Sequence, residues 1–481
     1  MSSRIRVLSA VSEIYPLVKT GGLADVAGAL PLALAENGVD VISLVPGYPA
    51  VMRSLENAQA VFSDPDLFGS PARVLSARAS GLDLLVIDAP YLFARSGGPY
   101  LGPNGRDWPD NGFRFGALGW IAAKIGAAQI PGFVPDIVHC HDWQASLAPA
   151  YLAYGKGQHC PSVVTIHNLA YQGQYPADLL SALRLPPNSF QIDGVEYYGA
   201  IGFLKAGLQF ADRITTVSPT YAREIQTPEH GFGMDGLLRA RAHVLSGITN
   251  GIDTQVWNPA ADDRIPATYS RATLERRSAD KAELQRRFGL ERDPSVLLFG
   301  VVSRLVSQKG IDLIPEMAPF LVEHGAQLAL LGTGDADLER RLISLASAYP
   351  GRISSIIGYD EDLAHLLQAS ADALLVPSRS EPCGLTQLCA LRYGAVPVVG
   401  KVGGLADTVA DPADSNEPTG FHFGPVTTPA FEQVLRRVFQ AWLDKPFWRR
   451  LQLNGMRIDV SWRKSAEQYA RLYSDLLQSK N

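Results

Sequence analysis

Short apolar runs alternate with stretches of helical periodicity along most of this chain, and this alternation limits its possible folds more than any other feature. In the N-terminal half, apolar runs that end in a turn or a polar cluster occupy residues 5–9, 39–45, 84–88, 137–139, 162–166 and 213–217. The stretch at 23–36 has helical spacing and ends at the turn sequence Asn37-Gly38. This alternation predicts an α/β fold, in which a parallel sheet carries helices on both faces.

A second series of the same kind begins at Ser295. Its apolar runs occupy residues 296–302, 327–331, 353–357, 373–377 and 396–399, with helical patterns at 311–324 and 337–348. A chain of 481 residues is also too long for one small domain. We therefore predict two doubly wound, Rossmann-like domains at residues 1–248 and 249–455, followed by an amphipathic helix within 456–481.

Composition argues against several classes of partner and location. The formal net charge is −5 and no basic stripe is present, so nucleic acid is not an expected partner. The four cysteines form no Cys-x-x-Cys pair, which is typical of reduced thiols in a cytoplasmic protein. The apolar run at residues 5–11 is too short for a signal peptide, and no stretch approaches the length of a membrane span.

Three loop features stand out. Residues 95–112 are rich in Gly, Pro, Asn and Asp, so we expect a long irregular loop of the kind that carries function. Residues 19–25 (Lys-Thr-Gly-Gly-Leu-Ala-Asp) match residues 401–407 at six of seven positions, which is consistent with an internal duplication, although so short a match also arises by chance. Asn250-Gly-Ile-Asp253 is typical of a turn, and its place between the halves makes it a candidate hinge.

The loop Lys19-Thr20-Gly21-Gly22 has the composition of a phosphate-binding turn. Glycines let a ligand approach the backbone, a helix start offers free N–H groups and a positive dipole, and Lys19 adds a full charge. The loop matches neither Gly-x-Gly-x-x-Gly nor the Walker pattern, which disfavours a nicotinamide oxidoreductase or a nucleoside triphosphatase. An ordinary turn between strand and helix explains the same residues equally well.

Two cations, Arg304 and Lys309, follow the apolar run at 296–302 in the second half. A guanidinium and an ammonium after a strand end can clamp a diphosphate and stabilise it as a leaving group. The alternative is a pair of solvated surface cations, which is the usual explanation for two isolated charges.

The segment Glu381-Pro-Cys-Gly-Leu-Thr386 follows the apolar run at 373–377 and enters a predicted helix at 387–393. Gly384, Leu385 and Thr386 would present backbone N–H groups at the start of that helix, beside the carboxylate of Glu381. A carboxylate near a phosphate site is unfavourable unless it has a role. We therefore predict that Glu381 accepts hydrogen bonds from sugar hydroxyls.

Polar residues end two strands of the first half, in His139-Cys-His-Asp-Trp143 and Thr165-Ile-His-Asn168. His141, Asp142 and His167 suggest a metal site, but the spacing defines no complete set of ligands. Recognition of a sugar fits these residues better, because the Asp142 and His167 side chains can each bond a hydroxyl.

Taken together, these motifs resemble those of the bacterial glycogen synthase and plant starch synthase family. The resemblance extends from about Val7 to about Tyr473 and so covers nearly the whole chain. The motifs that carry it are Lys19-Thr-Gly-Gly-Leu-Ala-Asp-Val-Ala-Gly-Ala-Leu-Pro31, His141-Asp-Trp143, Ile166-His-Asn168, Asn250-Gly-Ile-Asp253, Ser303-Arg304, Gln308-Lys-Gly310 and Glu381-Pro-Cys-Gly-Leu-Thr-Gln387. Each motif is modest evidence alone, and their occurrence in this order is highly specific.

The resemblance implies the GT-B architecture, in which two Rossmann-like domains face each other across a cleft and a C-terminal helix returns to the first domain. It implies transfer of glucose from ADP-glucose to the terminal 4-hydroxyl of an α-1,4-glucan such as glycogen, with retention of configuration. It also implies that neither a metal ion nor a cofactor takes part. The preference for ADP over UDP rests on the resemblance alone, and the sequence indicates no oligomeric state.

The same resemblance implies roles for individual residues. Its catalytic residues correspond to Arg304, Lys309, Glu381, His167 and Asp142. Its substrate-binding residues correspond to Lys19, Gly21, Gly22, Asp25, Tyr100, Asn168, Asn250, Tyr359, Cys383, Gly384, Leu385 and Thr386. Among these, Lys19 matches a donor-site lysine, Tyr100 a loop tyrosine, and Tyr359 the residue beside the adenine.

Two positions depart from the pattern. Many retaining GT-B enzymes carry a second glutamate eight residues after the first, where this chain has Cys389. The glycogen synthase branch does not rely on that acid. Gln144 stands where a histidine is common in the family, which affects local loop contacts and leaves the core site intact.

The motifs contain no clear nucleophile–acid pair of carboxylates like that of retaining hydrolases, so we expect a front-face displacement through an oxocarbenium-like species. The alternatives are a glucan phosphorylase, which would need a lysine for pyridoxal phosphate, a UDP-glucose-dependent glucosyltransferase, and a catalytically silent glucan-binding protein. The intact set of Lys19, Arg304, Lys309 and Glu381 argues against the silent protein.

Overall fold

A computed structural model describes residues 4–480 of the chain. The chain forms two compact units. The first comprises the chain up to Asn250 together with the segment from Trp462 onward, and the second spans Gly251–Ser461. Residues 456–461, which we expected to accompany the C-terminal helix, therefore lie in the second unit. No helix among residues 4–480 is long and apolar enough to cross a membrane.

The first unit is built on a nine-stranded sheet. Its strands are β1 (Ile5–Ala10), β2 (Val39–Pro46), β3 (Glu56–Asp64), β4 (Ala72–Ala79), β5 (Leu82–Asp88), β6 (Ile137–His141), β7 (Ser162–Ile166), β11 (Arg213–Thr216) and β12 (Leu245–Gly247). They lie in the order β12-β11-β7-β6-β1-β2-β5-β4-β3. The pairs β4–β5 and β3–β4 are antiparallel, and the other neighbours are parallel.

The antiparallel edge of this sheet is not evident in the sequence. The side chains of β3 are mostly exposed, so an apolar run is absent there. The strand β4 alternates buried and exposed residues, as expected for a strand with one face toward the core. A small antiparallel sheet made of β8 (Gln174–Pro176), β9 (Glu196–Tyr197) and β10 (Ala200–Gly202) also escaped prediction, because its strands are only two or three residues long.

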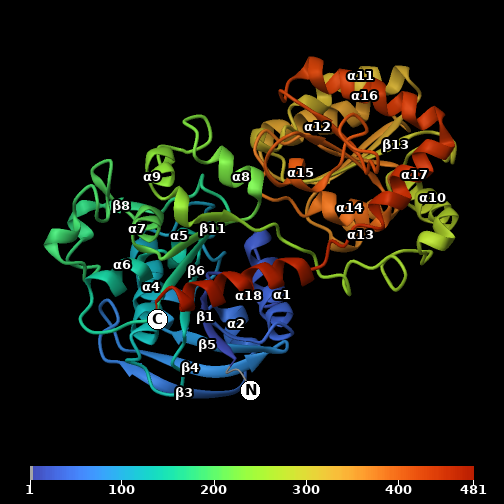
Figure 1. Ribbon diagram of the computed structural model, residues 1–481. Coiled ribbons are helices and arrows are strands. Elements are labelled where there is room, and N and C mark those ends of the chain that lie inside the picture. Colours follow the sequence, from blue (N-terminus) through green and yellow to red (C-terminus); the bar gives the residue numbers. More distant parts are fainter. Residues whose placement is uncertain (1–3, 481) are drawn as a thin grey trace. The chain divides into compact units, whose positions relative to one another are not determined.

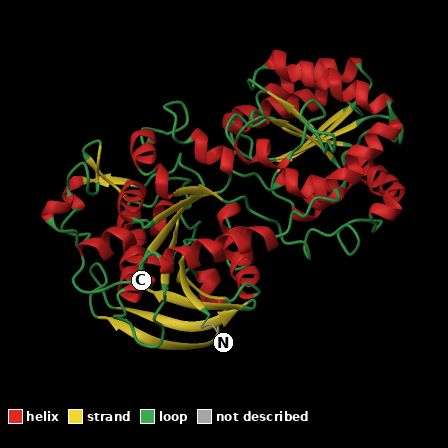
Figure 2. Ribbon diagram, in the orientation of Figure 1, coloured by secondary structure: helices red, strands yellow, loops and turns green. Residues whose placement is uncertain are grey.

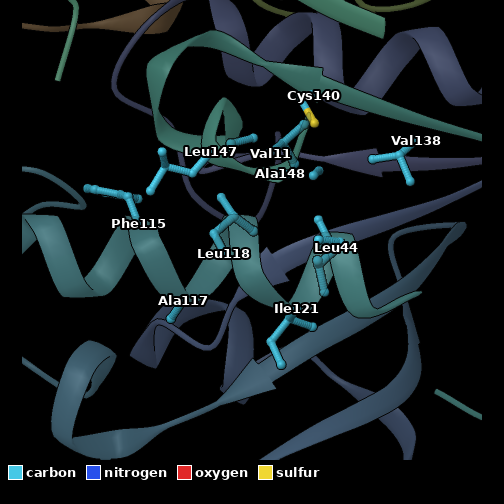
Figure 3. Packing of buried hydrophobic residues seen from close by; sticks show 14 of the residues in the cluster. Val11, Leu44, Phe115, Ala117, Leu118, Ile121, Val138, Cys140, Leu147 and Ala148 are labelled. Carbon is cyan, nitrogen blue, oxygen red and sulfur yellow. The ribbon is translucent and has the colours of Figure 1, made fainter. Parts of the chain in front are cut away.

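Helices cover both faces of the large sheet (Figure 2). They are α1 (Gly22–Ala35), α2 (Pro49–Arg53), α3 (Pro90–Phe93), α4 (Asn111–Gly126), α5 (Asp142–Ala145), α6 (Leu147–Tyr154), α7 (Phe203–Phe210), α8 (Pro219–Glu224), α9 (Asp235–Ala240) and α18 (Arg463–Gln478). Figure 3 shows Leu118 and Ile121 of α4 packed with Leu44 of β2 in the core. Thirteen of the sixteen residues of α4 are buried, so this helix is central to the first unit.

The C-terminal helix α18 packs on the first unit beside α1 (Figure 1). Its buried face contains Ala466, Tyr469 and Tyr473, and Trp462, the residue directly before the helix, continues the same spacing. These residues meet the buried face of α1 and residues of β1, including Val7. A segment that follows the second unit in sequence is therefore part of the hydrophobic core of the first.

The second unit contains a six-stranded sheet in which all neighbouring strands are parallel. Its strands are β13 (Leu298–Val302), β14 (Gln327–Gly332), β15 (Ile353–Ile357), β16 (Ala373–Val376), β17 (Val396–Gly400) and β18 (Phe421–Phe423). Its helices are α10 (Arg277–Arg287), α11 (Leu313–Glu323), α12 (Ala336–Ala348), α13 (Glu361–Ser370), α14 (Thr386–Tyr393), α15 (Gly403–Thr408), α16 (Thr428–Leu443) and α17 (Lys445–Gly455).

Strand order places a ligand site in each sheet. The second sheet has the order β15-β14-β13-β16-β17-β18, which reverses between β13 and β16. In the first sheet the order reverses between β1 and β6. Ligands of open α/β sheets bind outside the carboxyl ends of the strands at such a reversal. The loops after β1, β6, β13 and β16 carry most of the sequence motifs, and the motifs at 166–168 and 250–253 follow β7 and β12.

Candidate functional site

The loops after β13 and β16 border a pocket of about 150 Å³ in the second unit. Of the predicted residues, the pocket brings together Arg304, Lys309, Glu381 and Thr386. The other side chains that line it are Val302, Ser303, Ile311, Leu375, Val376, Pro377 and Ser378. Both predicted cations therefore lie where the strand order reverses, and Arg304 is exposed to solvent there.

Within this pocket Lys309 is paired with Glu381. The Nζ of Lys309 lies 2.5 Å from Oε2 of Glu381, and their side chains are 18% and 9% exposed. The hydroxyl of Ser378 also donates to Oε2 of Glu381, at 3.1 Å. An ammonium has three N–H donors, so Lys309 can hold this carboxylate and still bind an anion. The pocket thus presents a held carboxylate beside two cations.

Two glycines allow the backbone of neighbouring loops to approach the loop after β16 closely. Gly310 has a φ of +67°, and a Cβ atom there would lie 1.9 Å from the carbonyl oxygen of Pro377. Gly403 has a φ of +41°, and its Cβ would lie 2.0 Å from the carbonyl oxygen of Glu381. The second copy of the repeated heptapeptide, at 401–407, therefore supports the backbone of the Glu381 loop.

The residues at the start of α14 lie beside the pocket. Gly384 has a φ of +73°, and its carbonyl oxygen accepts a hydrogen bond from the side chain of Gln387 at 2.9 Å. The same amide donates to the carbonyl oxygen of Cys383 at 3.0 Å. Leu385 is the residue before the helix, and Thr386 is its first residue. The loop that carries these predicted residues is thus held by Gln387.

In the first unit, the loop after β1 is organised by a residue that our motif reasoning missed. The buried carboxylate of Glu13 accepts hydrogen bonds from the backbone N–H of Thr20, the hydroxyl of Thr20 at 2.8 Å and the N–H of Gly21 at 3.3 Å. From the sequence, a phosphate-binding turn and an ordinary turn explained these residues equally well. In this structure the N–H groups of Thr20 and Gly21 are hydrogen-bonded to Glu13.

The remaining predicted residues of this loop lie at the start of α1. Lys19 forms an ion pair with Asp25, with 2.7 Å between Nζ and Oδ1. Gly21 precedes the helix and Gly22 is its first residue. A Cβ atom at Gly21 would meet no other atom within 4 Å, in contrast to Gly403 in the second heptapeptide. The backbone at Gly21 is therefore open on the side where a side chain would project.

The irregular loop at 95–110 places Tyr100 against Glu13. The hydroxyl of Tyr100 donates to Oε1 of Glu13 at 3.0 Å, and it lies 2.8 Å from the hydroxyl of Ser12. Burial raises the pKa of Glu13, and hydrogen bonds from Thr20, Tyr100 and Gly21 oppose that rise. Glu13 therefore connects two loops that are distant in the sequence.

The loops after β6 and β7 bring Asp142 and His167 together. Asp142 has a φ of +55°, a left-handed conformation that Asp tolerates better than most residues. Its Oδ1 accepts hydrogen bonds from the N–H groups of His167, at 2.7 Å, and Asn168, at 3.3 Å. Burial raises the pKa of Asp142 to about 7, against the lowering effect of those two hydrogen bonds. Asp142 thus fixes the backbone that carries His167.

Three predicted residues stand apart from these groups. Asn250 is the last residue of the first unit before the chain enters the second, and it is buried. Its Oδ1 lacks a hydrogen-bond partner among the residues that the structure describes. Tyr359 follows β15, is 75% exposed and donates its hydroxyl to Glu361, and it does not line the pocket. Cys383 is buried.

The Nδ1 of His141 is hydrogen-bonded to Nε2 of His167, with 3.0 Å between the two atoms. Over residues 4–480, no group of three or more His, Cys, Asp and Glu side chains is arranged to hold a metal ion.

Comparisons with known proteins identify the family. A family model described as "Starch synthase catalytic domain" matches residues 6–240, and one described as "Glycosyl transferases group 1" matches residues 280–446. The glycogen synthase of Rhodopseudomonas palustris (strain BisB18) is 58% identical over 99% of this chain and 98% of its own length. This chain belongs to the glycogen synthase family. The glycogen synthase of Methylocella silvestris is 57% identical, over 99% of this chain and the whole of that relative.

The structural comparison agrees with the family assignment. The catalytic domain of Starch Synthase IV from Arabidopsis thaliana, solved bound to ADP and acarbose, matches with a TM-score of 0.88 and 31% identity. The match covers 99% of this chain and all of the other. The resemblance drawn from the motifs is thereby confirmed, as are the α/β GT-B fold and the class of enzyme, a glycosyltransferase. The roles of individual residues stay predictions.

The histidines at the ends of β6 and β7 predict how stability depends on pH. Burial lowers the pKa of His141 from 6.5 to about 3, and it lowers the pKa values of His139 and His167 well below 6.5. Below pH 6.5 the unfolded chain binds protons that these folded rings do not. Acidification from about pH 7 to about pH 5 should therefore reduce the free energy of unfolding, by up to ~1.4 kcal/mol per pH unit for each such ring.

Thermal unfolding across this pH range tests the expectation. Asp142 has the opposite effect on stability, because burial raises its pKa to about 7. As the pH falls, the carboxyl of the folded protein gains a proton before that of the unfolded chain does, which stabilises the fold. Comparison of the wild type with His141→Asn isolates one histidine. The melting temperature of the variant should fall less steeply than that of the wild type as the pH is lowered. An equal fall in the two proteins would contradict the assignment of a neutral, buried His141.

Proposed function

We propose that this glycosyltransferase is a glycogen synthase that transfers glucose from ADP-glucose to the non-reducing end 4-hydroxyl of an α-1,4-glucan, with retention of configuration. The observation that carries the proposal is the pocket after β13 and β16, which is lined by Arg304, Lys309 and Glu381 and in which Lys309 holds the carboxylate of Glu381. Two cations suit a diphosphate, and a fixed carboxylate suits sugar hydroxyls. A cytoplasmic location agrees with four free cysteines.

In the proposed reaction, Arg304 and Lys309 hold the diphosphate of the donor and stabilise the charge that develops as it leaves. Glu381 accepts hydrogen bonds from the sugar, and Thr386 and Gly384 lie beside the diphosphate. The bond between C1 and the diphosphate oxygen breaks first, and the acceptor hydroxyl attacks C1 from the same face. The departing phosphate oxygen takes the proton of that hydroxyl, so no separate base and no metal ion is required.

The first unit supplies the other predicted contacts. Asp142 and His167 bond hydroxyls of the transferred glucose, and Asn168 and Asn250 contribute polar groups to the same substrate. Lys19, Gly21, Gly22, Asp25 and Tyr100 belong to the substrate-binding set, and Glu13 holds the loops on which they lie. In the second unit, Tyr359 contacts the adenine. The Arabidopsis starch synthase was solved with ADP bound, which supports the choice of base.

The test is incorporation of labelled glucose into a glycogen primer, with ADP-glucose and UDP-glucose supplied in parallel and a chelator present. We expect chelator-insensitive transfer from ADP-glucose and at least ~10-fold slower transfer from UDP-glucose, because one nucleotide-specific hydrogen bond corresponds to roughly that factor. Faster transfer from UDP-glucose would overturn the choice of donor. Absence of transfer from both would favour a silent glucan-binding protein.

A further inference from the structure

The rings of three histidines lie in a row, those of His139 and His141 on β6 and that of His167 just after β7, and only His167 was predicted to contact substrate. His139 and His141 lie two residues apart on β6, so their side chains project from the same face of the sheet. Their ring centroids are 4.1 Å apart, with 30° between the ring planes. The rings of His141 and His167 are 5.2 Å apart. His139 and His141 are each only 1% exposed.

The ring of His139 is hydrogen-bonded to a hydroxyl group through each of its two nitrogens. The Nδ1 of His139 lies 2.7 Å from the hydroxyl of Tyr473 on α18, and its Nε2 lies 2.6 Å from the hydroxyl of Thr165 on β7. The hydroxyl of Thr165 in turn lies 2.5 Å from that of Thr215 on β11. His139 therefore cannot turn without breaking hydrogen bonds to a neighbouring strand and to the C-terminal helix.

The imidazole rings of His141 and His167 are joined by a hydrogen bond. The Nδ1 of His141 and the Nε2 of His167 are 3.0 Å apart. Both rings are neutral near pH 7, because burial lowers their pKa values. Two nitrogens that both lack a proton cannot form a hydrogen bond, so one of these two atoms carries it. The proton on that bond determines the tautomer of His167 and hence whether its Nδ1 donates or accepts.

We propose that His141 is a positioning residue that fixes the ring orientation and the tautomer of His167. The proposal rests on the proposed function, in which His167 bonds a hydroxyl of the transferred glucose. His141 contacts His167 on one side and the ring of His139 on the other. The backbone of His167 is fixed separately, by the hydrogen bond from its N–H to Asp142. Backbone and ring are thus oriented by two different side chains.

The surrounding charges leave this pair undisturbed. The structure records no ion pair of a carboxylate or a cation with His141 or His167 among the described residues. The acidic group nearest in the chain, Asp142, directs its Oδ1 to backbone N–H groups and not to either ring. The hydrogen bond between Nδ1 of His141 and Nε2 of His167 is therefore the interaction that selects a tautomer for His167.

Three variants separate positioning from simple packing. His141→Asn places an amide near the position of Nδ1 and keeps a hydrogen-bonding group for His167. His141→Leu keeps an apolar volume and removes that group. Cys140→Ala is the matched control, because Cys140 is buried on the same strand and faces the opposite side of the sheet. It perturbs β6 without touching the histidines.

We expect His141→Leu to reduce kcat for transfer from ADP-glucose by about 10²-fold, since a small misplacement of a group at a reacting centre costs that much. His141→Asn should recover most of this loss, and Cys140→Ala should leave kcat near the wild-type value. ¹⁵N NMR of histidine-labelled enzyme, with His167 assigned from a His167→Asn sample, should show one tautomer in the wild type and a mixture or the opposite tautomer in His141→Leu.

The proposal is overturned if His141→Leu retains kcat, if His141→Asn is as impaired as His141→Leu, or if the tautomer of His167 is unchanged in His141→Leu. Failure of the proposed function has a different signature. A wild type that transfers glucose from neither nucleotide sugar would refute the enzyme activity, whereas the NMR comparison would still decide whether His141 sets the tautomer of His167.

Discussion

Replacing Lys309 with alanine is expected to lower kcat by about 10²- to 10³-fold, the usual effect of removing one group that stabilises charge in a transition state. Lys309 lies in the pocket after β13, with its Nζ 2.5 Å from Glu381. Alanine removes the ammonium that, in the proposed reaction, neutralises the departing diphosphate, and it also removes the partner that holds Glu381 in place. Initial rates of glucose transfer at saturating ADP-glucose measure the effect.

The control for this variant is Arg436→Ala. Arg436 is also a cation of the second unit paired with a carboxylate, that of Glu432, but both lie on the surface of α16. An exposed pair of this kind contributes little to stability, so we expect activity and melting temperature close to those of the wild type. Near-normal turnover of Lys309→Ala, with the fold intact by circular dichroism, would refute the role of Lys309 in binding the diphosphate.

Replacing Gly310 with alanine is expected to destabilise the second unit strongly. Gly310 has a φ of +67°, a conformation that costs a residue with a Cβ roughly 1–2 kcal/mol. The new Cβ would also lie 1.9 Å from the carbonyl oxygen of Pro377, so the loops after β13 and β16 must move apart. Strain of this kind adds about 1–3 kcal/mol. The displacement also moves Lys309, so activity should fall with stability.

Gly289→Ala separates the two contributions. Gly289 lies in the same unit with a φ of +63°, and a Cβ atom there would meet no other atom within 4 Å. Both variants therefore carry the cost of the left-handed backbone, and only Gly310→Ala carries the collision. Denaturant unfolding should show the larger loss for Gly310→Ala. Equal losses in the two variants would mean that the approach of Gly310 to Pro377 is not a source of strain.

Much of the fold was predictable because parallel strands buried on both faces appear as continuous apolar runs. The predicted strands at 162–166 and 353–357 coincide with β7 and β15, and the helix predicted at 337–348 corresponds to α12 (Ala336–Ala348). The edge strand β3 could not be predicted in the same way, because exposed side chains produce no apolar run. Its pairing with β4 depends on contacts between separate segments of the chain.

The candidate site was partly predictable for a related reason. Arg304 and Glu381 follow predicted strands, and strand ends are where ligands bind in such sheets. Glu13 also follows a strand, but the sequence of a lone glutamate before Ile-Tyr-Pro gives no sign of the contacts it makes. Its importance appears only when Thr20, Gly21 and Tyr100 are seen around its carboxylate. The one indication in the sequence that Glu13 belongs to the site was its position after the first strand.

The sequence by itself determined the family, the two-domain α/β fold and the identity of the charged residues at the strand ends. These properties are local, since periodicity and motif spacing are set by neighbouring residues. The tertiary structure alone decided that Glu13 meets the N–H groups of Thr20 and Gly21, and that Lys309 holds Glu381. It also decided that α18 fixes His139. These contacts join residues far apart in the chain, and only folding brings their atoms within hydrogen-bonding distance.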